Sequence, residues 1–171
     1  MTPADTTTSA AAVDRARRLL DAVCDPEIPV LTISDLGLVR DLKMQEDGTL
    51  EVVITPTYSG CPAMDVIGVN IRAVLEEGGF PKVKVSSVLA PAWTTAWLSE
   101  DGRRKLREFG IAPPAEPSAD KKALLGEERI LACPHCGSTR TEMISQFGST
   151  ACKALFRCLD CLEPFDYFKC H

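Results

Sequence analysis

The sequence predicts an α+β protein: a small three-stranded sheet with packed helices, followed by a short cysteine-rich module. Two observations carry this prediction. Segments with helical and strand-like periodicity follow each other in the order helix, hairpin, helix, strand, helix, which is typical of a sheet covered by helices. Most of the cysteines then lie near the end of the chain, behind a segment rich in Pro and Ala.

Length, charge and cysteine content narrow the function classes. The 171 residues suit one medium domain or two small ones. The formal net charge of −5 argues against nucleic acid or an anionic membrane as partners. The N-terminus lacks the pattern of a secretory signal, and no apolar run approaches the ~20 residues needed to span a bilayer, so we expect a cytoplasmic location. Thiols stay reduced there, so the eight cysteines predict metal or thiol chemistry rather than disulfides.

The first domain is expected over residues 13–110, after a small, polar and disordered stretch over 1–12. Apolar residues recur at helical spacing from Val13 to Val23, and Pro26 cannot continue that helix. Two strand-like runs, LVRDLKMQ and LEVVITPT, flank the sequence EDGT. Asp-Gly between such runs is a strong signal for a β-hairpin.

A second helix and a third strand follow the hairpin. After Gly60 the apolar spacing becomes helical, and a Gly-Gly pair ends the helix. KVKVSSVL predicts the third strand, and AWTTAWLSEDGRRKLREFG predicts one or two short helices that close the domain. The Pro- and Ala-rich residues 111–128 are expected to form a linker, and residues 129–171 a second domain.

The second domain contains two Cys-x-x-Cys pairs, Cys133 with Cys136 and Cys158 with Cys161. Each pair can form a knuckle with both sulfurs on one side, and two knuckles give the tetrahedron of thiolates that zinc prefers. The segment is too short to bury a real core, so a metal would supply the missing folding energy. Four cysteines leave no open coordination position, which predicts a structural zinc ribbon rather than a catalytic metal. Iron, alone or as a cluster, is an alternative that the spacing does not exclude.

The other thiols and histidines of this domain are open to two interpretations. Cys152 and Cys170 are either ordinary thiols, which we prefer, or an additional thiol site that receives or passes a metal. His135 lies inside the first knuckle and is expected to face solvent rather than to bind the metal, and His171 has no assigned role. The aromatic residues in EPFDYFKC are expected to form the small core of the ribbon rather than a docking face.

One cysteine of the first domain, Cys61, lies where the second strand turns into the second helix. Pro62 suits the first helical position, which would place Cys61 at or near the N-cap. There the helix dipole and free amides would lower the pKa of the thiol and make it reactive. The alternative is a small residue that suits a tight turn. Asp25 and Glu27 could face Cys61 as ligands or as acid and base, or could simply form a turn, which we prefer on the residues alone.

These residues also carry a resemblance to a known family. CDPEIPVLTISDLGLV and VVITPTYSGCPAMDVI are similar to the small α+β domain of iron–sulfur maturation proteins, which act in the bacterial SUF-associated pathway and the eukaryotic cytosolic targeting complex. The resemblance implies that Cys61 is functional. The family's signature positions match Asp25, Pro26, Glu27, Thr55, Thr57 and Cys61.

Over nearly its whole length, the chain resembles more closely the family of D components of phenylacetyl-CoA 1,2-epoxidase systems, which act in aerobic phenylacetate catabolism. The resemblance rests on LAPAWTTAWLSEDGRRKL, GIAPP and FGSTACKALFRC…EPFDYFKCH. The ribbon is its most specific part, because ordinary maturation domains lack it. The WTTxW motif is expected to hold an acidic residue, and Ala96 stands there instead, so no role can be carried over for that carboxylate.

The resemblance implies an accessory protein, since the di-iron catalytic subunit and the iron–sulfur flavin reductase of such systems are separate chains. This sequence has neither paired Glu-x-x-His motifs nor a Gly-x-Gly-x-x-Gly fingerprint, so it is not expected to be catalytic alone. We expect it to assist insertion of iron or a transient iron–sulfur cluster into a partner subunit such as the reductase. Cys61 would be the labile ligand or transfer thiol, oriented by Asp25 and Glu27. The alternative is a structural component that stabilises the epoxidase complex.

Two other classes fit the residues less well. A thiol-dependent enzyme would need a base near Cys61, and both histidines lie in or beside the ribbon. A DNA-binding ribbon is disfavoured by the acidic charge. Because Cys61 is expected at the domain surface, two chains could share a cluster there, so a homodimer is a further expected partnership.

Overall fold

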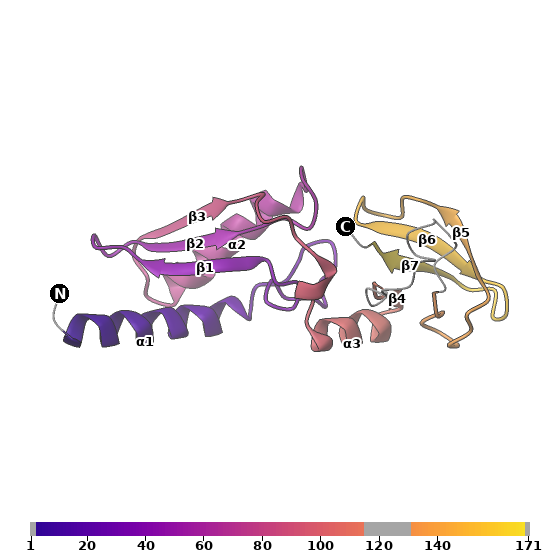
Figure 1. Cartoon of the computed structure of the whole chain (residues 1–171), viewed down its shortest axis with the longest axis horizontal. Helices are drawn as coiled ribbons and strands as arrows, with labels where there is room; N and C mark the ends of the chain where they lie inside the picture. The colour runs from indigo at the N-terminus through magenta and orange to yellow at the C-terminus, as the bar shows by residue number, and fades with distance from the viewer. Residues whose placement is uncertain (1–2, 115–130, 170–171) are drawn as a thin grey trace. The chain divides into compact units, whose positions relative to one another are not determined.

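The computed structural model describes residues 3–114 and 131–169 (Figure 1). The chain divides into two compact units, Met1–Trp93 and Thr94–His171. Among the described residues, no helix combines the length and the apolar character that crossing a membrane requires. Each unit has its own sheet and its own buried core, and each is therefore described by itself.

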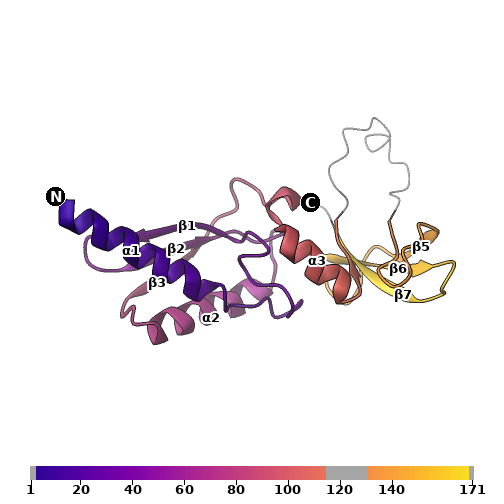
Figure 2. The ribbon, with the colours of Figure 1, turned by 90° about the horizontal axis from the view of Figure 1, so that it is seen from below.

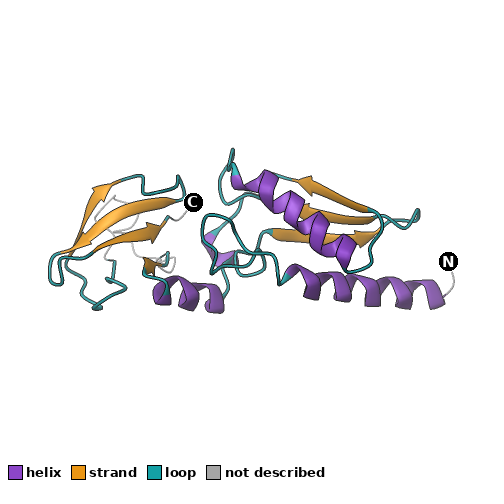
Figure 3. Cartoon of the chain, turned by 180° about the vertical axis from the view of Figure 1, so that it is seen from behind, coloured by secondary structure: helices purple, strands orange, loops and turns teal. Residues whose placement is uncertain are grey.

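The first unit is a three-stranded sheet with two helices. β1 and β2 form the predicted antiparallel hairpin, and β2 pairs in parallel with β3 through the crossover helix α2. α1 packs on β1, α2 packs on β3, and the two helices contact each other, so they cover the same face of the sheet (Figures 2 and 3). The elements are α1 (Pro3–Leu20), β1 (Val39–Met44), β2 (Leu50–Ile54), α2 (Ala63–Glu77) and β3 (Val83–Ser87).

Alternating burial along β2 shows why this face needs helices. Leu50, Val52 and Ile54 are fully buried, whereas the residues between them are partly exposed, as a half-buried strand requires. The apolar stripes predicted for the two helices supply the other side of the core. Its helical members include Ala16, Leu20, Ile67, Ile71 and Leu75.

The first helix starts earlier than the sequence pattern predicts. α1 begins at Pro3, so part of the stretch 1–12 that we expected to be disordered is helical. Local preference favours the earlier start. Pro is well suited to the first helical turn, and three consecutive alanines, the best helix formers, precede Val13.

The second unit is a four-stranded sheet with two short helices before it. The strand order is β4-β7-β6-β5, with β4 parallel to β7 and the other pairs antiparallel. Phe156 packs against Phe165 and Tyr167 at ring-centroid distances of 6.0 and 5.8 Å, so the aromatic residues form the core as predicted. The elements are η1 (Thr95–Trp97), α3 (Glu100–Glu108), β4 (Ile111–Ala112), β5 (Thr141–Ser145), β6 (Lys153–Cys158) and β7 (Pro164–Phe168).

The boundary between the units differs from the one near residue 110 that the sequence suggests. The indole N–H of Trp93 donates to the carbonyl of Leu36 at 2.7 Å, and Trp93 is the last residue of the first unit. Arg103 of α3 is buried and donates to the carbonyls of Thr95 and Pro114 at 2.9 and 2.8 Å. That side chain ties α3 to η1 and to the chain behind β4, so α3 belongs to the second unit.

The expected linker over 111–128 starts with structured residues. Ile111 and Ala112 form β4, which adds to the edge of the ribbon sheet beside β7. A strand of two residues has no periodicity that a sequence could reveal. The rest of the expected linker, from residue 115 on, lies outside the described residues.

Candidate functional site

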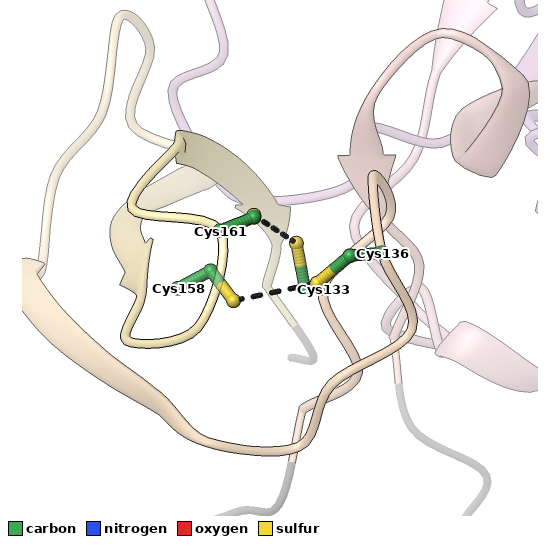
Figure 4. A group of neighbouring side chains, drawn as sticks. All are labelled: Cys133, Cys136, Cys158 and Cys161. Atoms are coloured by element: carbon green, nitrogen blue, oxygen red, sulfur yellow. Dashed lines mark hydrogen bonds between the residues drawn. The ribbon is translucent and has the colours of Figure 1, made fainter.

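The four cysteines of the two Cys-x-x-Cys pairs form one cluster (Figure 4). Their sulfurs all lie within 4.8 Å of one another. Cys133 lies 3.7 Å from Cys161, and Cys136 lies 3.6 Å from Cys158, measured between Sγ atoms. Tetrahedral zinc with bonds of ~2.3 Å would place its sulfurs ~3.8 Å apart, so the cluster has the donor type and dimensions that a zinc ion requires.

The two knuckles share a backbone conformation that points both sulfurs of a pair inward. In the first, the N–H of Cys133 donates to the Ser138 carbonyl at 2.8 Å, and Gly137 has a left-handed φ of 77°. In the second, the N–H of Cys158 donates to the Glu163 carbonyl at 3.0 Å, and Leu162 has a φ of 66°. Leucine in this conformation is strained, so the knuckle geometry prevails over the residue's own preference.

The electrostatics of the cluster favour a bound cation. Backbone N–H groups, that of Cys161 first, lower the pKa of Cys158 to about 6. At Cys161 the N–H of Glu163 acts in the same direction, but burial and the neighbouring thiols outweigh it and raise the pKa to about 12. Without a metal, therefore, the Cys158 thiol ionises readily, whereas the Cys161 thiol resists a second negative charge beside it. A divalent cation relieves that repulsion and displaces the protons.

A polar contact that the sequence analysis missed joins the two knuckles. Asp160, inside the second pair, accepts from the guanidinium of Arg140 at 2.5 Å and from the hydroxyl of Ser138. The backbone N–H of Leu159 also donates to the Arg140 carbonyl at 2.8 Å. The sequence could have indicated this contact. An acidic residue between two metal-binding cysteines adds negative charge to an anionic site unless a cationic side chain pairs with it.

The remaining candidates of the ribbon lie outside the cluster. His135 is exposed, as predicted, and is not part of the four-sulfur group. Cys152 is buried, and its sulfur lies 3.1 Å from the hydroxyl of Thr150. The interpretation of Cys152 as an ordinary thiol stays a prediction. Cys170 and His171 lie outside the described residues.

Cys61 lies in the loop between β2 and α2, where the sequence placed it. A turn brings it back to Tyr58, whose carbonyl accepts from the Cys61 N–H at 3.4 Å, and Gly60 supplies the left-handed φ of 83°. Pro62 is the N-cap of α2, so Cys61 directly precedes the cap. Its thiol is half-buried.

The prediction that the helix terminus lowers the pKa of Cys61 is wrong in sign. Burial raises the pKa of this thiol above its ordinary value, and the carboxylates of Glu27 and Asp25 raise it further. The Ala63 N–H and the Tyr58 hydroxyl act in the opposite direction, but they do not prevail. The sequence indicated the effect of a backbone amide at the start of the helix. It did not indicate the burial of the Cys61 thiol, which depends on packing from distant parts of the chain.

Asp25 and Glu27 therefore lie close enough to influence Cys61. Asp25 also forms the predicted turn, because its Oδ1 accepts from the N–H groups of Glu27 and Ile28 at 2.8 Å each. These three candidates do not form a closed ligand cage: within residues 3–114 and 131–169, the ribbon cysteines are the one group of three or more possible metal ligands close enough to hold an ion.

A buried hydroxyl in the same strand-to-helix segment has no partner. Thr55, directly after β2, is 1% exposed, and its Oγ1 makes no hydrogen bond within the described part of the chain. Unpaired buried polar groups are rare in folded proteins, because each one loses its hydrogen bonds to water and gains none in return. Packing alone does not account for this threonine, which the family resemblance singles out.

Comparisons with known proteins agree with this two-part organisation. A family model described as an iron–sulfur cluster assembly protein matches residues 14–89, and one described as the PaaD zinc beta ribbon domain matches residues 117–169. A crystal structure of a domain of unknown function, DUF59, from Bacillus anthracis is similar with a TM-score of 0.55 and 28% identity. That similarity covers 59% of this chain and 96% of the Bacillus chain.

Two curated relatives are informative. An Fe-S protein maturation auxiliary factor from Porphyromonas gingivalis is 37% identical over 90 residues, covering 52% of this chain and 85% of that protein. A protein of Escherichia coli K12, named as the D component of 1,2-phenylacetyl-CoA epoxidase, is 53% identical over 152 residues, covering 89% of each chain. Since that similarity spans both units and both family models match in the same order, the chain belongs to the family of phenylacetyl-CoA epoxidase D components.

Proposed function

We propose that this protein helps to insert iron or an iron–sulfur cluster into a partner subunit of the epoxidase system. The observation that carries the proposal is the environment of Cys61, within the segment that matches the iron–sulfur assembly model. Its thiol is half-buried beside two carboxylates, and the described residues form no closed cage around it. A thiol that binds cargo without enclosing it suits a protein that must pass the cargo on.

The chemistry of the Cys61 loop fits a cationic cargo. With its pKa raised, the free thiol stays protonated at neutral pH and reacts poorly with oxidants and electrophiles. Positive charge brought near Glu27 and Asp25 would offset the field that keeps the proton on sulfur. Binding would then release the proton to solvent and convert Cys61 into a thiolate ligand, and Asp25 and Glu27 would orient the cargo.

Several finer assignments belong to the same proposal. We infer that zinc is the resident metal of Cys133, Cys136, Cys158 and Cys161, where it would hold the second unit together. The client would be the iron–sulfur flavin reductase, reached in the cytoplasm. A homodimer could provide a second Cys61 when one copy alone offers too few ligands.

The test compares two single-cysteine variants during maturation of the reductase. The reductase is produced together with wild type, Cys61→Ser or Cys24→Ser, and its iron and acid-labile sulfide are measured per chain without oxygen. Cys24 is an exposed cysteine of the same unit and provides the matched control. We expect Cys61→Ser to leave the reductase without its cluster, while Cys24→Ser supports normal loading. A fully loaded reductase with Cys61→Ser would overturn the proposal, provided that the variant's circular dichroism is unchanged.

A purely structural role is the second candidate, favoured by exposed apolar side chains on the second unit. Met143, Ile144 and Phe147 are 53%, 52% and 63% exposed, more than a free surface normally tolerates close together in the sequence. In that case the protein would co-purify with the epoxidase in a fixed ratio and Cys61 would be replaceable. Substoichiometric, transient association would favour the maturation role.

A further inference from the structure

Three segments of the first unit meet at one end of its sheet. Because β2 and β3 are parallel, the loop that holds Cys61 and the segment after β3 start at the same end (Figure 1). The N–H of Val88 donates to the Ile54 carbonyl at 2.9 Å, which holds the segment after β3 beside the end of β2. β1 is antiparallel to β2, so the loop before β1 reaches this end as well. We call the surface formed by residues 24–38, 55–69 and 88–93 the Cys61 surface.

The exposed apolar side chains of the first unit are concentrated on the Cys61 surface. Among the described residues of this unit, the large apolar side chains that are exposed are Val66, Val69 and Leu89, at 48%, 59% and 64%. Val66 and Val69 lie in the first two turns of α2, on the face opposite the buried Ile67 and Ile71. A helix at a free surface is expected to be polar on that face. Apolar exposure gathered around one site indicates a surface that binds a partner.

The charge of the Cys61 surface has one sign. Its three segments contain four acidic residues and neither lysine nor arginine, in a chain with 19 basic residues. Asp35 is buried and accepts hydrogen bonds from Thr32, whereas Asp25, Glu27 and Asp65 are at least partly exposed. An apolar surface with an acidic border complements an apolar patch that is bordered by lysine or arginine. Without cargo, two copies of the Cys61 surface would repel each other, which disfavours a second copy of this chain as the partner.

We propose that the Cys61 surface is the docking surface for the client, and that the client presents an apolar patch bordered by basic residues. The inference rests on the proposed function, which requires the client to approach the Cys61 sulfur. Cargo passes directly between two proteins only where ligands of both reach the same metal, so the receiving protein has to cover this end of the sheet. The apolar contacts would come from Val66, Val69 and Leu89, and the acidic border from Asp25, Glu27 and Asp65.

Docking is tested by calorimetric titration of the full-length, zinc-loaded protein with cluster-free reductase, without oxygen. Leu89→Lys places a positive charge in the apolar contact and should weaken binding about 10-fold. Leu89→Glu loses the same apolar contact but keeps the negative sign of the surface, so it should weaken binding less. Phe109→Lys, at an exposed apolar residue of the second unit, is the matched control and should bind as wild type does. Equal affinity of Leu89→Lys and wild type would overturn the inference, and a larger loss with Leu89→Glu than with Leu89→Lys would overturn the basic border.

Cluster loading separates this inference from the proposed function. We expect Leu89→Lys and Val69→Lys to leave the reductase without its cluster although both retain Cys61. Cys61→Ser should also leave it without a cluster, but should bind the reductase more tightly than Leu89→Lys does. Normal loading by both lysine variants, together with failure of Cys61→Ser, would overturn the docking surface and leave the proposed function standing. Sedimentation of the cargo-free protein gives the other outcome, since a dimer that Leu89→Lys dissociates would identify a second copy as the occupant and overturn the inference.

Discussion

The ribbon cluster and the Cys61 loop place the same functional group in contrasting environments. In the ribbon, four sulfurs converge within 4.8 Å and are buried to different degrees among a small aromatic core. At Cys61, a single half-buried sulfur lies within the electrostatic influence of the Glu27 and Asp25 carboxylates. The ribbon can satisfy a metal completely, whereas the loop cannot. The contrast teaches that the number of cysteines and their proximity distinguish a site for a resident metal from a site whose cargo has to leave.

The largest expected effect comes from breaking the ribbon cluster. Cys158→Ser removes one of four ligands, and binding of structural zinc is worth ~10–16 kcal/mol of folding free energy in small modules. We expect the second unit to lose its metal and its cooperative thermal transition, while the first unit keeps its helical circular dichroism. Zinc analysis and thermal unfolding measure this. Cys152→Ala, outside the cluster, should retain a full complement of zinc.

The second largest expected effect comes from replacing Thr55, which lies in the same strand-to-helix segment as Cys61. Thr55→Val removes a buried hydroxyl without a partner, which should raise the free energy of unfolding by ~1 kcal/mol. Thr32→Val is the matched control, because the Thr32 hydroxyl donates to the Asp35 carboxylate at 2.9 Å, and its loss should destabilise. Urea unfolding compares the two. A stabilised Thr55→Val protein that no longer loads its client would show that the hydroxyl is retained for function.

A third effect concerns the charge around Cys61. Because the pKa of Cys61 is raised, its thiolate forms, and iodoacetamide reacts with it, at higher pH than for an ordinary cysteine. Glu27→Gln removes one of the carboxylates that raise the pKa, so the midpoint of the pH–rate profile should fall. Mass spectrometry follows the Cys61 peptide. The reaction of Cys24 in the same samples should not change, and an upward shift at Cys61 would contradict the assignment.

The raised pKa of Cys61 also determines how the stability of the first unit changes with pH. A thiol whose pKa is higher in the folded protein than in the unfolded chain stabilises the fold fully while both states are protonated. That contribution of Cys61 is lost as the pH rises from the unfolded pKa toward the folded one. Cys61→Ser should therefore flatten the decline in stability of the first unit at alkaline pH.

The smallest effect concerns the second knuckle. Leu162 is 69% exposed and left-handed, so glycine should relieve strain there at little cost in burial. We expect Leu162→Gly to stabilise the zinc-loaded ribbon by ~0.5–1 kcal/mol. Gly137→Ala, at the equivalent position of the first knuckle, should destabilise it by a similar amount. Guanidinium unfolding of the two variants provides the comparison, and equal effects of the same sign would contradict the strain argument.

The features that the sequence predicts well are those that depend on spacing. Two Cys-x-x-Cys pairs are a local pattern, and local geometry suffices to turn each pair into a knuckle. Asp47-Gly48 similarly marks the hairpin, and Gly48 has the left-handed φ of 79° that such a turn uses. In each case the information lies within a few consecutive residues.

The features that the sequence did not predict depend on contacts between distant residues. The raised pKa of Cys61 arises from burial and from carboxylates more than 30 positions away in the chain. The assignment of α3 to the second unit depends on the buried guanidinium of Arg103 and its two carbonyl partners, and β4 exists only because β7 pairs with it. Neither spacing nor composition encodes such partners.

The placement of β4 has a practical consequence for dissecting the protein. A fragment cut at residue 129, where the ribbon pattern begins, would remove β4 and expose the backbone edge of β7, which favours aggregation. A fragment that starts at Thr94 would retain that edge strand together with the Arg103 contacts. Experiments on the isolated metal module should therefore begin some 35 residues earlier than the cysteine pattern suggests.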